Sequence, residues 1–161
     1  MQANSSAYIR TFTGGYFYPA LPESLAPDIR DIAHALSLVG RYNGHLEWFY
    51  SVAQHSMLVE EIASARMREA CPSMEVCSFN KFRLQALLHD ATEAYLPDMP
   101  SPIKQFLPDF QALEKRLQEQ IYKWHDLPEH THSIIKEVDT QIREAEMRSM
   151  SNWEEPFINN R

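Results

Sequence analysis

The sequence is poor in glycine and cysteine. Its 161 residues include 4 Gly and 2 Cys, against 10 Pro. So few glycines disfavour a turn-rich β architecture, and the prolines instead predict helices separated by stiff joints. Cys71 and Cys77 are separated by five residues, a spacing that fits neither a zinc pair nor a redox CxxC motif. We therefore expect a reducing, cytoplasmic compartment.

Positive charge and long apolar runs are also scarce. Lys and Arg total 15 while Asp and Glu total 22, which gives a formal net charge of -7. An acidic chain repels phosphate backbones, and no basic cluster stands out, so we expect no nucleic-acid partner. No apolar run approaches the roughly 18 residues of a membrane span, and residues 1–10 lack the apolar core of a signal peptide. We expect no membrane partner either.

The hydrophobic pattern is that of one helical domain. Length and composition, with 44% hydrophobic and 23% charged residues, predict a single globular domain over 1–161. Residues 1–26 are irregular, with short extended pieces at YIRTF and YFY, and 150–161 form a short tail. Between them, apolar residues recur at helical spacing in about five segments. The sequence therefore predicts an all-α helical bundle.

Several residues predict where these helices begin and end. Asp28 is a candidate N-cap for the first helix, which Gly40 ends, and Ser51 opens the second. The third is expected from about Asn80 to Tyr95. The prolines of LPDMPSP, residues 96–102, predict a stiff non-helical loop after it. The last two helices are expected to start near 108 and 134.

Two histidines and two aspartates carry the metal hypothesis. His55 lies on the apolar side of its helix, and His89-Asp90 follows the apolar run LQALL, where an unpaired Asp would be costly to bury. Asp139 lies in the last helix. Taken singly, His55 could be a core histidine and Asp139 a solvated residue. Together, two His and two Asp suit a divalent transition metal better than Ca²⁺.

This pattern resembles the HD-domain metal-dependent phosphohydrolases, whose signature is H…HD…D on separate helices of an all-α bundle. It stands here as YSVAQHS at 50–56, LHDATEAYLPDMPSPIK at 88–104 and KEVDTQI at 136–142. The resemblance covers about 29–145. It is greatest to the small bacterial and phage branch that acts on deoxynucleotides, whose members include 5′-deoxynucleotidases and dATP triphosphohydrolases. The connector RYNGH at 41–45 is similar to that branch as well.

The resemblance implies two catalytic carboxylates. Glu93, three residues after Asp90 on the same predicted helix face, would orient a metal-activated water and accept its proton. Asp98, on the proline loop, would assist proton transfer and hold substrate or water. The alternative for Glu93 is a solvated helix glutamate.

Four further residues are candidates for substrate binding, and two of them, Arg41 and Lys104, match substrate-binding positions of the family. Arg41 and Lys104 would hold phosphate, Tyr42 would stack on the sugar or base, and His45 would bond a phosphate oxygen. The alternatives are ordinary surface cations for Arg41 and Lys104 and a structural role for His45.

Other histidines are interpreted as unrelated to the site. His125-Asp126 is a second HD dipeptide, but Pro128 ends the predicted helix at once. His130 and His132 form an HxH pair in a predicted loop, which favours solvated histidines over a metal pair.

The resemblance implies a metal-dependent deoxynucleotide phosphohydrolase using one divalent transition ion (Co²⁺, Mn²⁺, Zn²⁺, Ni²⁺ or Fe²⁺). We expect dATP as substrate, with release of deoxynucleoside and triphosphate and with additional Mg²⁺ on the triphosphate. A 5′-deoxynucleotidase acting on monophosphates is the first alternative, and a non-catalytic helical interaction module is the second. The resemblance also implies a homo-oligomer, located in the cytoplasm of the host cell if the chain is phage-encoded. Alarmone hydrolases (HDxxED) and cyclic-dinucleotide phosphodiesterases (GYP) are disfavoured because their motifs are missing.

Overall fold

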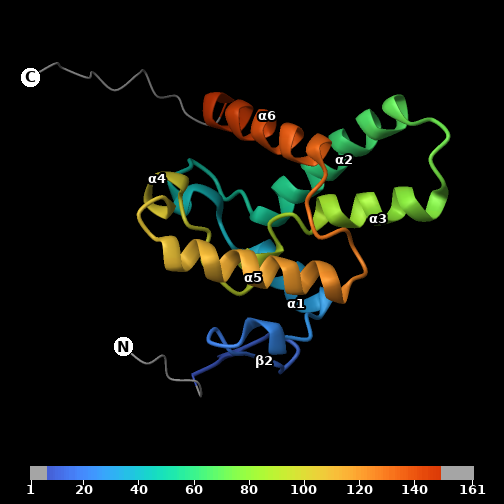
Figure 1. The fold of residues 1–161 in the computed structure, drawn as a ribbon. Coiled ribbons are helices and arrows are strands. Elements are labelled where there is room, and N and C mark those ends of the chain that lie inside the picture. Colours follow the sequence, from blue (N-terminus) through green and yellow to red (C-terminus); the bar gives the residue numbers. More distant parts are fainter. Residues whose placement is uncertain (1–6, 150–161) are drawn as a thin grey trace, which may run out of the picture.

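The computed structural model describes residues 7–149, and these residues are mostly helical (Figure 1). A two-stranded antiparallel hairpin precedes the helices. The elements are β1 (Ile9–Arg10), β2 (Tyr16–Phe17), η1 (Pro22–Ser24), α1 (Ile29–Leu38), η2 (Arg41–Gly44), α2 (Val52–Ala70), α3 (Val76–Leu87), η3 (Ala91–Ala94), α4 (Ser101–Lys104), α5 (Pro108–Trp124) and α6 (Ser133–Ser149), where η marks a 3-10 turn. The all-α prediction is confirmed, and the short extended pieces expected near the N-terminus are the hairpin strands. The expected tail at 150–161 lies outside the described residues.

Side-chain caps explain where the first two helices begin. The Asp28 carboxylate accepts a hydrogen bond from the Arg30 backbone N–H at 2.8 Å, which satisfies one of the open donors of α1. Ser51 and Gln54 form a reciprocal capping box at the start of α2. Both predicted helix starts are confirmed.

Two predicted boundaries are wrong. The third helix ends at Leu87 instead of continuing to Tyr95, so His89 and Asp90 lie in the turn between α3 and η3. The proline loop also contains helix, because Ser101–Lys104 form the short α4. Proline needs no N–H in the first turn of a helix, so Pro102 starts this turn rather than preventing it.

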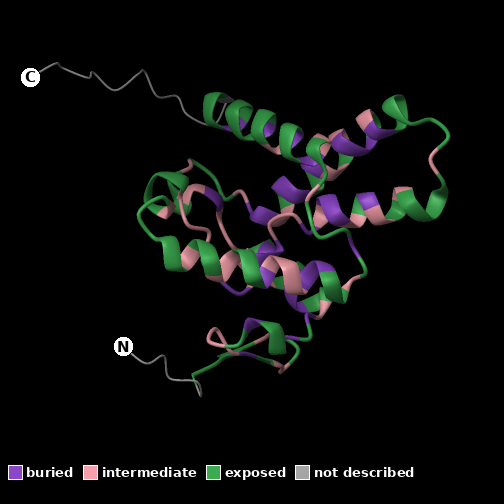
Figure 2. Ribbon diagram, viewed as in Figure 1, coloured by how far each residue is buried: buried purple, intermediate pink, exposed green. Residues whose placement is uncertain are grey.

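Two hydrophobic clusters form the core. One contains Leu36, Val52 and Leu117 and joins α1, α2, η3 and α5. The other contains Val59, Ala86 and Val138 and joins α2, α3 and α6. Figure 2 shows the buried faces of these helices turned toward one another. Helix α2 contributes to both clusters and therefore links the two halves of the core.

Within residues 7–149, every helix is too short or too polar to span a lipid bilayer.

Candidate metal centre

His55 reaches the centre of the molecule from α2. Val52 and Val59, its neighbours three and four residues away, are fully buried in the two different hydrophobic clusters. The His55 side chain lies on the same face of the helix and is 0% exposed. The apolar pattern of α2 thus places an imidazole at the boundary between the two halves of the core.

His89 and Asp90 reach the same point from the turn that follows α3. The chain leaves the helix after Leu87, and the buried Leu88 anchors the turn in the core. Gln118 on α5 donates a hydrogen bond to the Leu88 carbonyl oxygen at 3.0 Å. Nε2 of His89 and Oδ2 of Asp90 lie 3.2 Å apart in this turn, so the two side chains meet at one point.

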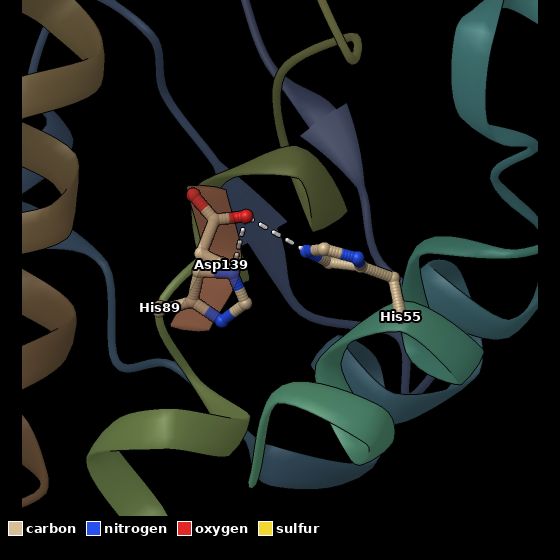
Figure 3. A group of neighbouring side chains, drawn as sticks. All are labelled: His55, His89 and Asp139. Atoms are coloured by element: carbon tan, nitrogen blue, oxygen red, sulfur yellow. Dashed lines mark hydrogen bonds and ion pairs between the residues drawn. The ribbon is translucent and has the colours of Figure 1, made fainter. Parts of the chain in front are cut away.

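Asp139, from α6, completes the group. Its Oδ1 atom lies 3.0 Å from Nε2 of His55 and 3.8 Å from Nε2 of His89. Figure 3 shows both imidazoles turned toward this carboxylate, and the ligand atoms of the three residues all lie within 4.8 Å of one another. Asp90 is also close, with Oδ2 3.2 Å from Nε2 of His89 and 3.9 Å from Nε2 of His55. All four predicted ligands therefore meet in space.

The charges around these residues favour a cation. Burial lowers the pKa of His89, but Asp90 and Asp139 outweigh burial and raise it to about 10. Burial opposes the charge of Asp90, yet the neighbouring His89 and His55 lower its pKa to about 2. Burial opposes the charge of Asp139 too, yet the neighbouring His55 and His89 lower its pKa. Both carboxylates thus stay ionised and would attract a divalent ion.

One buried atom supports this interpretation directly. Nε2 of His89 is buried and makes no hydrogen bond among the described residues, although carboxylate oxygens lie near it. Nδ1 of the same ring lies 2.8 Å from the Ala86 carbonyl oxygen, which can only accept, so Nδ1 carries the proton. At neutral pH the raised pKa of His89 keeps a second proton on Nε2, and a metal ion would replace that proton and use the Nε2 lone pair. An imidazole lone pair beside carboxylates is a donor set that suits a transition metal.

Glu93 and Asp98 lie beside this centre. Glu93 belongs to η3 rather than to a continuous helix, and its buried Oε2 atom has no hydrogen-bond partner among the described residues. Burial, followed by the charges of Asp90 and Asp98, raises the pKa of Glu93 to about 9. Burial also raises the pKa of Asp98. The turn therefore brings Glu93 near Asp90, as predicted, by a different backbone path.

A cavity of about 390 Å³ opens onto the centre. Its wall includes His89, Asp90, Glu93 and Lys104 from the predicted site. Lys104 lies at the end of α4, and its Nζ atom donates to Glu114 at 2.7 Å. A cavity of this size beside buried titratable groups is typical of a small-molecule site.

Arg41 and Tyr42 have partners that the sequence analysis did not anticipate. Arg41 is 7% exposed; its guanidinium lies 3.0 Å from Glu146 and 3.8 Å from Asp90. The Tyr42 hydroxyl donates to Glu146 at 2.9 Å. Tyr42, Asn43 and Gly44 follow one another in the left-handed region, with φ of 55°, 53° and 75°. His45, at the end of this turn, is exposed and is not part of the cavity wall.

Glu146 is the residue that the sequence analysis missed. It is buried in α6, seven residues after Asp139, and its Oε1 atom lies 2.8 Å from Nδ1 of His55. A spacing of seven residues puts two side chains on one face of a helix, which is the signal that could have found it. The hydrogen bonds from His55 and Tyr50 outweigh burial and lower its pKa to about 2.

The other histidines have separate surroundings. Asp126 is exposed and pairs with Lys81, and His125 is not among the described residues that form the metal group. His132 contacts Phe82 edge-on and accepts a hydrogen bond from the Ile134 N–H at the start of α6. His130 is exposed but lines the cavity, a position that its interpretation as a solvated loop histidine did not include.

Known proteins resemble this chain over most of its length. The model of the family described as "5′-deoxynucleotidase YfbR-like" matches residues 31–151. The chain is 34% identical over 144 residues to the uncharacterized protein YfdR of Escherichia coli K12, covering 89% of this chain and 72% of that protein. It is 34% identical over 141 residues to the uncharacterized protein RCAP_rcc00048 of Rhodobacter capsulatus, covering 83% and 68%. With its H…HD…D residues gathered at one point, the chain belongs to the YfbR-like 5′-deoxynucleotidase family of HD-domain phosphohydrolases.

Proposed function

We propose that this protein is a metal-dependent 5′-deoxynucleotidase that hydrolyses deoxynucleoside monophosphates to deoxynucleosides and orthophosphate. The family match over residues 31–151 is the observation that carries the proposal. It favours the monophosphate alternative over the dATP triphosphohydrolase that we expected from the sequence. The geometry of the metal group is consistent with either substrate, so the choice between them depends on the cavity.

The charges of the cavity wall also support a monophosphate. Carboxyl side chains outnumber lysines there, and two of the three lysines already have acidic partners: Lys104 pairs with Glu114 and Lys115 with Glu119. A triphosphate carries more negative charge than a monophosphate and needs more unpaired cations around it. Lys136 is the third lysine of the wall. One metal ion and few available ammonium groups match a single phosphoryl group better than a triphosphate tail.

His55, His89, Asp90 and Asp139 would hold the metal. When bound, a divalent ion supplies Lewis-acid polarisation of the phosphoryl group and lowers the pKa of a nearby water molecule. The protein's own contribution is to hold these four side chains in one place, with both imidazoles largely shielded from water. The ion would be Co²⁺, Mn²⁺, Zn²⁺, Ni²⁺ or Fe²⁺, because two imidazoles and two carboxylates suit all of these.

Glu93 would exchange the proton of the reaction. Its Oε2 atom is buried and unpartnered within the described chain, and its raised pKa of about 9 keeps the carboxyl protonated at neutral pH, so that it can donate a proton. Water attacks phosphorus, the bond from phosphorus to the 5′ oxygen breaks, and the 5′ oxygen leaves with a proton. We assign the transfer of that proton to Glu93, assisted by Asp98. Lys104 and Arg41 would balance the phosphate charge.

A substrate panel tests the proposal. Purified protein with Co²⁺ or Mn²⁺ would be incubated with dAMP, dGMP, dCMP, dTMP, AMP and dATP, and both orthophosphate and inorganic triphosphate would be measured. We expect orthophosphate from the deoxynucleoside monophosphates, less from AMP, no triphosphate from dATP, and no reaction in EDTA. The Asp139→Ala variant, purified in the same way, controls for contaminating phosphatases. Triphosphate release from dATP with inert monophosphates would reverse the assignment and restore the original expectation.

We also propose that the protein is a cytoplasmic homo-oligomer, as the family resemblance implies. Exposed Trp48 and Phe49 next to the connector support a further protein contact, since large aromatic side chains are enriched at interfaces. Light scattering coupled to size exclusion measures the mass directly. A single species of 18.8 kDa would contradict an oligomer.

A further inference from the structure

Glu146 lies at the centre of a buried polar cluster beside the metal group. Its side chain is 4% exposed. Oε1 lies 2.8 Å from Nδ1 of His55 and accepts from the Tyr50 hydroxyl at 2.7 Å. Oε2 accepts from Arg41 at 3.0 Å and from the Tyr42 hydroxyl at 2.9 Å. Four donors from two separate segments thus converge on one carboxylate.

The contact of Glu146 with His55 requires a proton on the Nδ1 atom of the ring. An ionised carboxylate can only accept hydrogen bonds, so the Nδ1 atom of His55 must be the donor. The ring therefore keeps its proton on Nδ1 when a metal ion takes the place of any proton on Nε2. That atom lies 3.0 Å from Oδ1 of Asp139, on the side of the metal group.

We propose that Glu146 is a positioning residue of the metal centre, which holds the His55 ring with its proton on Nδ1 and its Nε2 atom available to the metal. Metal-bound histidines commonly donate their other ring N–H to a carboxylate or to a backbone carbonyl. His89 shows the second form, since its Nδ1 contacts the Ala86 carbonyl oxygen at 2.8 Å. The inference rests on the proposed metal centre and is independent of which nucleotide is the substrate.

Pairing with Arg41 alone does not account for this arrangement. A buried carboxylate is costly, and the ion pair with Arg41 on Oε2 offsets part of that cost. Oε1 contacts His55 and Tyr50, and neither of these contacts is needed to pair the carboxylate with Arg41. The carboxylate therefore connects the ring of a predicted metal ligand to Arg41 and Tyr42, two of the predicted substrate-binding residues of the connector.

Three variants separate positioning from general stability. Glu146→Ala removes both oxygens, whereas Glu146→Gln keeps the shape but leaves one oxygen for which His55 and Arg41 compete. Glu144→Gln is the matched control, because Glu144 lies on the same helix, is exposed and pairs with Arg148. The affinity for Zn²⁺ would be measured by competition with a chromogenic chelator, and circular dichroism would verify the helices. We expect Zn²⁺ affinity to fall roughly 10- to 100-fold in both Glu146 variants and to stay unchanged in the control.

Nitrogen-15 NMR of the histidine side chains adds a signature that a structural role would not produce. In the Zn²⁺-loaded wild type, we expect His55 to be bound through Nε2 and to show a slowly exchanging, downfield Nδ1–H proton. In Glu146→Gln this proton should move upfield and exchange faster. The spectrum of the wild type tests the proposal even if Glu146→Ala does not fold.

The experiments distinguish failure of the role of Glu146 from failure of the metal centre itself. Wild-type affinity for Zn²⁺ in folded Glu146→Gln with an unchanged Nδ1–H signal, or binding of Zn²⁺ through Nδ1 in the wild type, would refute the role of Glu146 and leave the metal centre intact. A wild-type protein that does not bind Zn²⁺ would refute both.

Discussion

The Nζ atom of Lys104 lies 2.7 Å from Oε1 of Glu114, on the wall of the cavity that contains His89 and Asp90. Both side chains are about one-quarter exposed, so water weakens their attraction without removing it. A lysine that is held by a carboxylate is less available to a phosphate. The pair therefore sets how strongly this side of the cavity attracts a nucleotide.

Substitutions of this pair should move the KM for a deoxynucleoside monophosphate in opposite directions. Lys104→Met removes a charged contact to phosphate, worth about 1.5–3 kcal/mol, so the KM should rise roughly 10- to 100-fold. Glu114→Gln frees the ammonium group, so the KM should fall. Lys123→Met, an exposed lysine of α5 away from the cavity wall, serves as the control. An unchanged KM in both variants would remove Lys104 from the substrate site.

Glu93→Gln should retain metal and substrate but slow hydrolysis by about 10²–10⁴-fold, the usual contribution of a general acid or base. Glutamine keeps the size of the side chain and loses its ability to exchange a proton. Single-turnover rates, with metal content measured in the same samples, check this prediction. If metal content fell together with the rate, Glu93 would be a ligand and its proposed role would be wrong.

The aspartate of the second HD dipeptide, Asp126, is a control for the predicted metal ligands Asp90 and Asp139. Asp90→Ala and Asp139→Ala should each abolish metal binding and hydrolysis while the helices persist, because each removes one of four ligands and leaves both hydrophobic clusters intact. Asp126→Ala should bind metal normally, since Asp126 is exposed and pairs with Lys81. Metal bound per chain, measured by elemental analysis after dialysis, distinguishes these cases. Equal metal content in Asp90→Ala and Asp126→Ala would contradict the ligand assignment.

Two buried tyrosines should respond differently to loss of the hydroxyl group. The Tyr122 hydroxyl lies 2.9 Å from Thr131 Oγ1, so Tyr122→Phe should lower the free energy of unfolding by about 1 kcal/mol. The Tyr95 hydroxyl is buried without a hydrogen-bond partner among the described residues. Tyr95→Phe should therefore leave stability unchanged or raise it. Urea unfolding at pH 7 measures both values, and a loss in Tyr95→Phe as large as that in Tyr122→Phe would contradict this account.

Tyr122 also predicts how the stability of the protein depends on pH above pH 10. Burial raises the pKa of Tyr122 from 10.0 to about 12, so the folded state favours the neutral phenol. Its contribution to stability is complete below pH 10 and is lost as the pH rises from 10 toward 12. Tyr122→Phe should therefore lose less stability than the wild type over this interval. Parallel unfolding curves at pH 9 and pH 11 check the difference, and an identical loss in the two proteins would count against it.

Strong local signals explain which parts of the fold could be predicted. Asp28 and Ser51 cap their helices as expected, because capping requires only residues that are adjacent in sequence. The end of α3 at Leu87 was missed because the apolar pattern continues through Leu88, which anchors a turn instead of a helix. Periodicity alone does not distinguish these two uses of a buried leucine.

In the site too, residues marked by a sequence motif could be predicted, whereas contacts between distant parts of the chain could not. His55, His89, Asp90 and Asp139 could be identified because they occur in a motif with specific flanking residues. Glu146 contacts His55 across 91 positions of sequence; its spacing of seven residues from Asp139 places it on the same helix face but does not show that it is buried or which residue it contacts. Arg41 was expected to hold phosphate, and its ion pair with Glu146 depends on the same long-range packing of α6.

The left-handed backbone at Tyr42 and Asn43 has a consequence for the motion of the chain. A left-handed conformation costs about 1–2 kcal/mol for a residue with a side chain, although asparagine tolerates it better than most. Two such residues in succession favour a change of the backbone away from this conformation. The hydrogen bond from the Tyr42 hydroxyl to Glu146 of α6 opposes that change. Backbone amides around residues 42–45 should therefore exchange with deuterium through small local fluctuations, well before those in the middle of α2. The contacts of Arg41 and Tyr42 with Glu146 therefore limit the opening of a strained backbone segment.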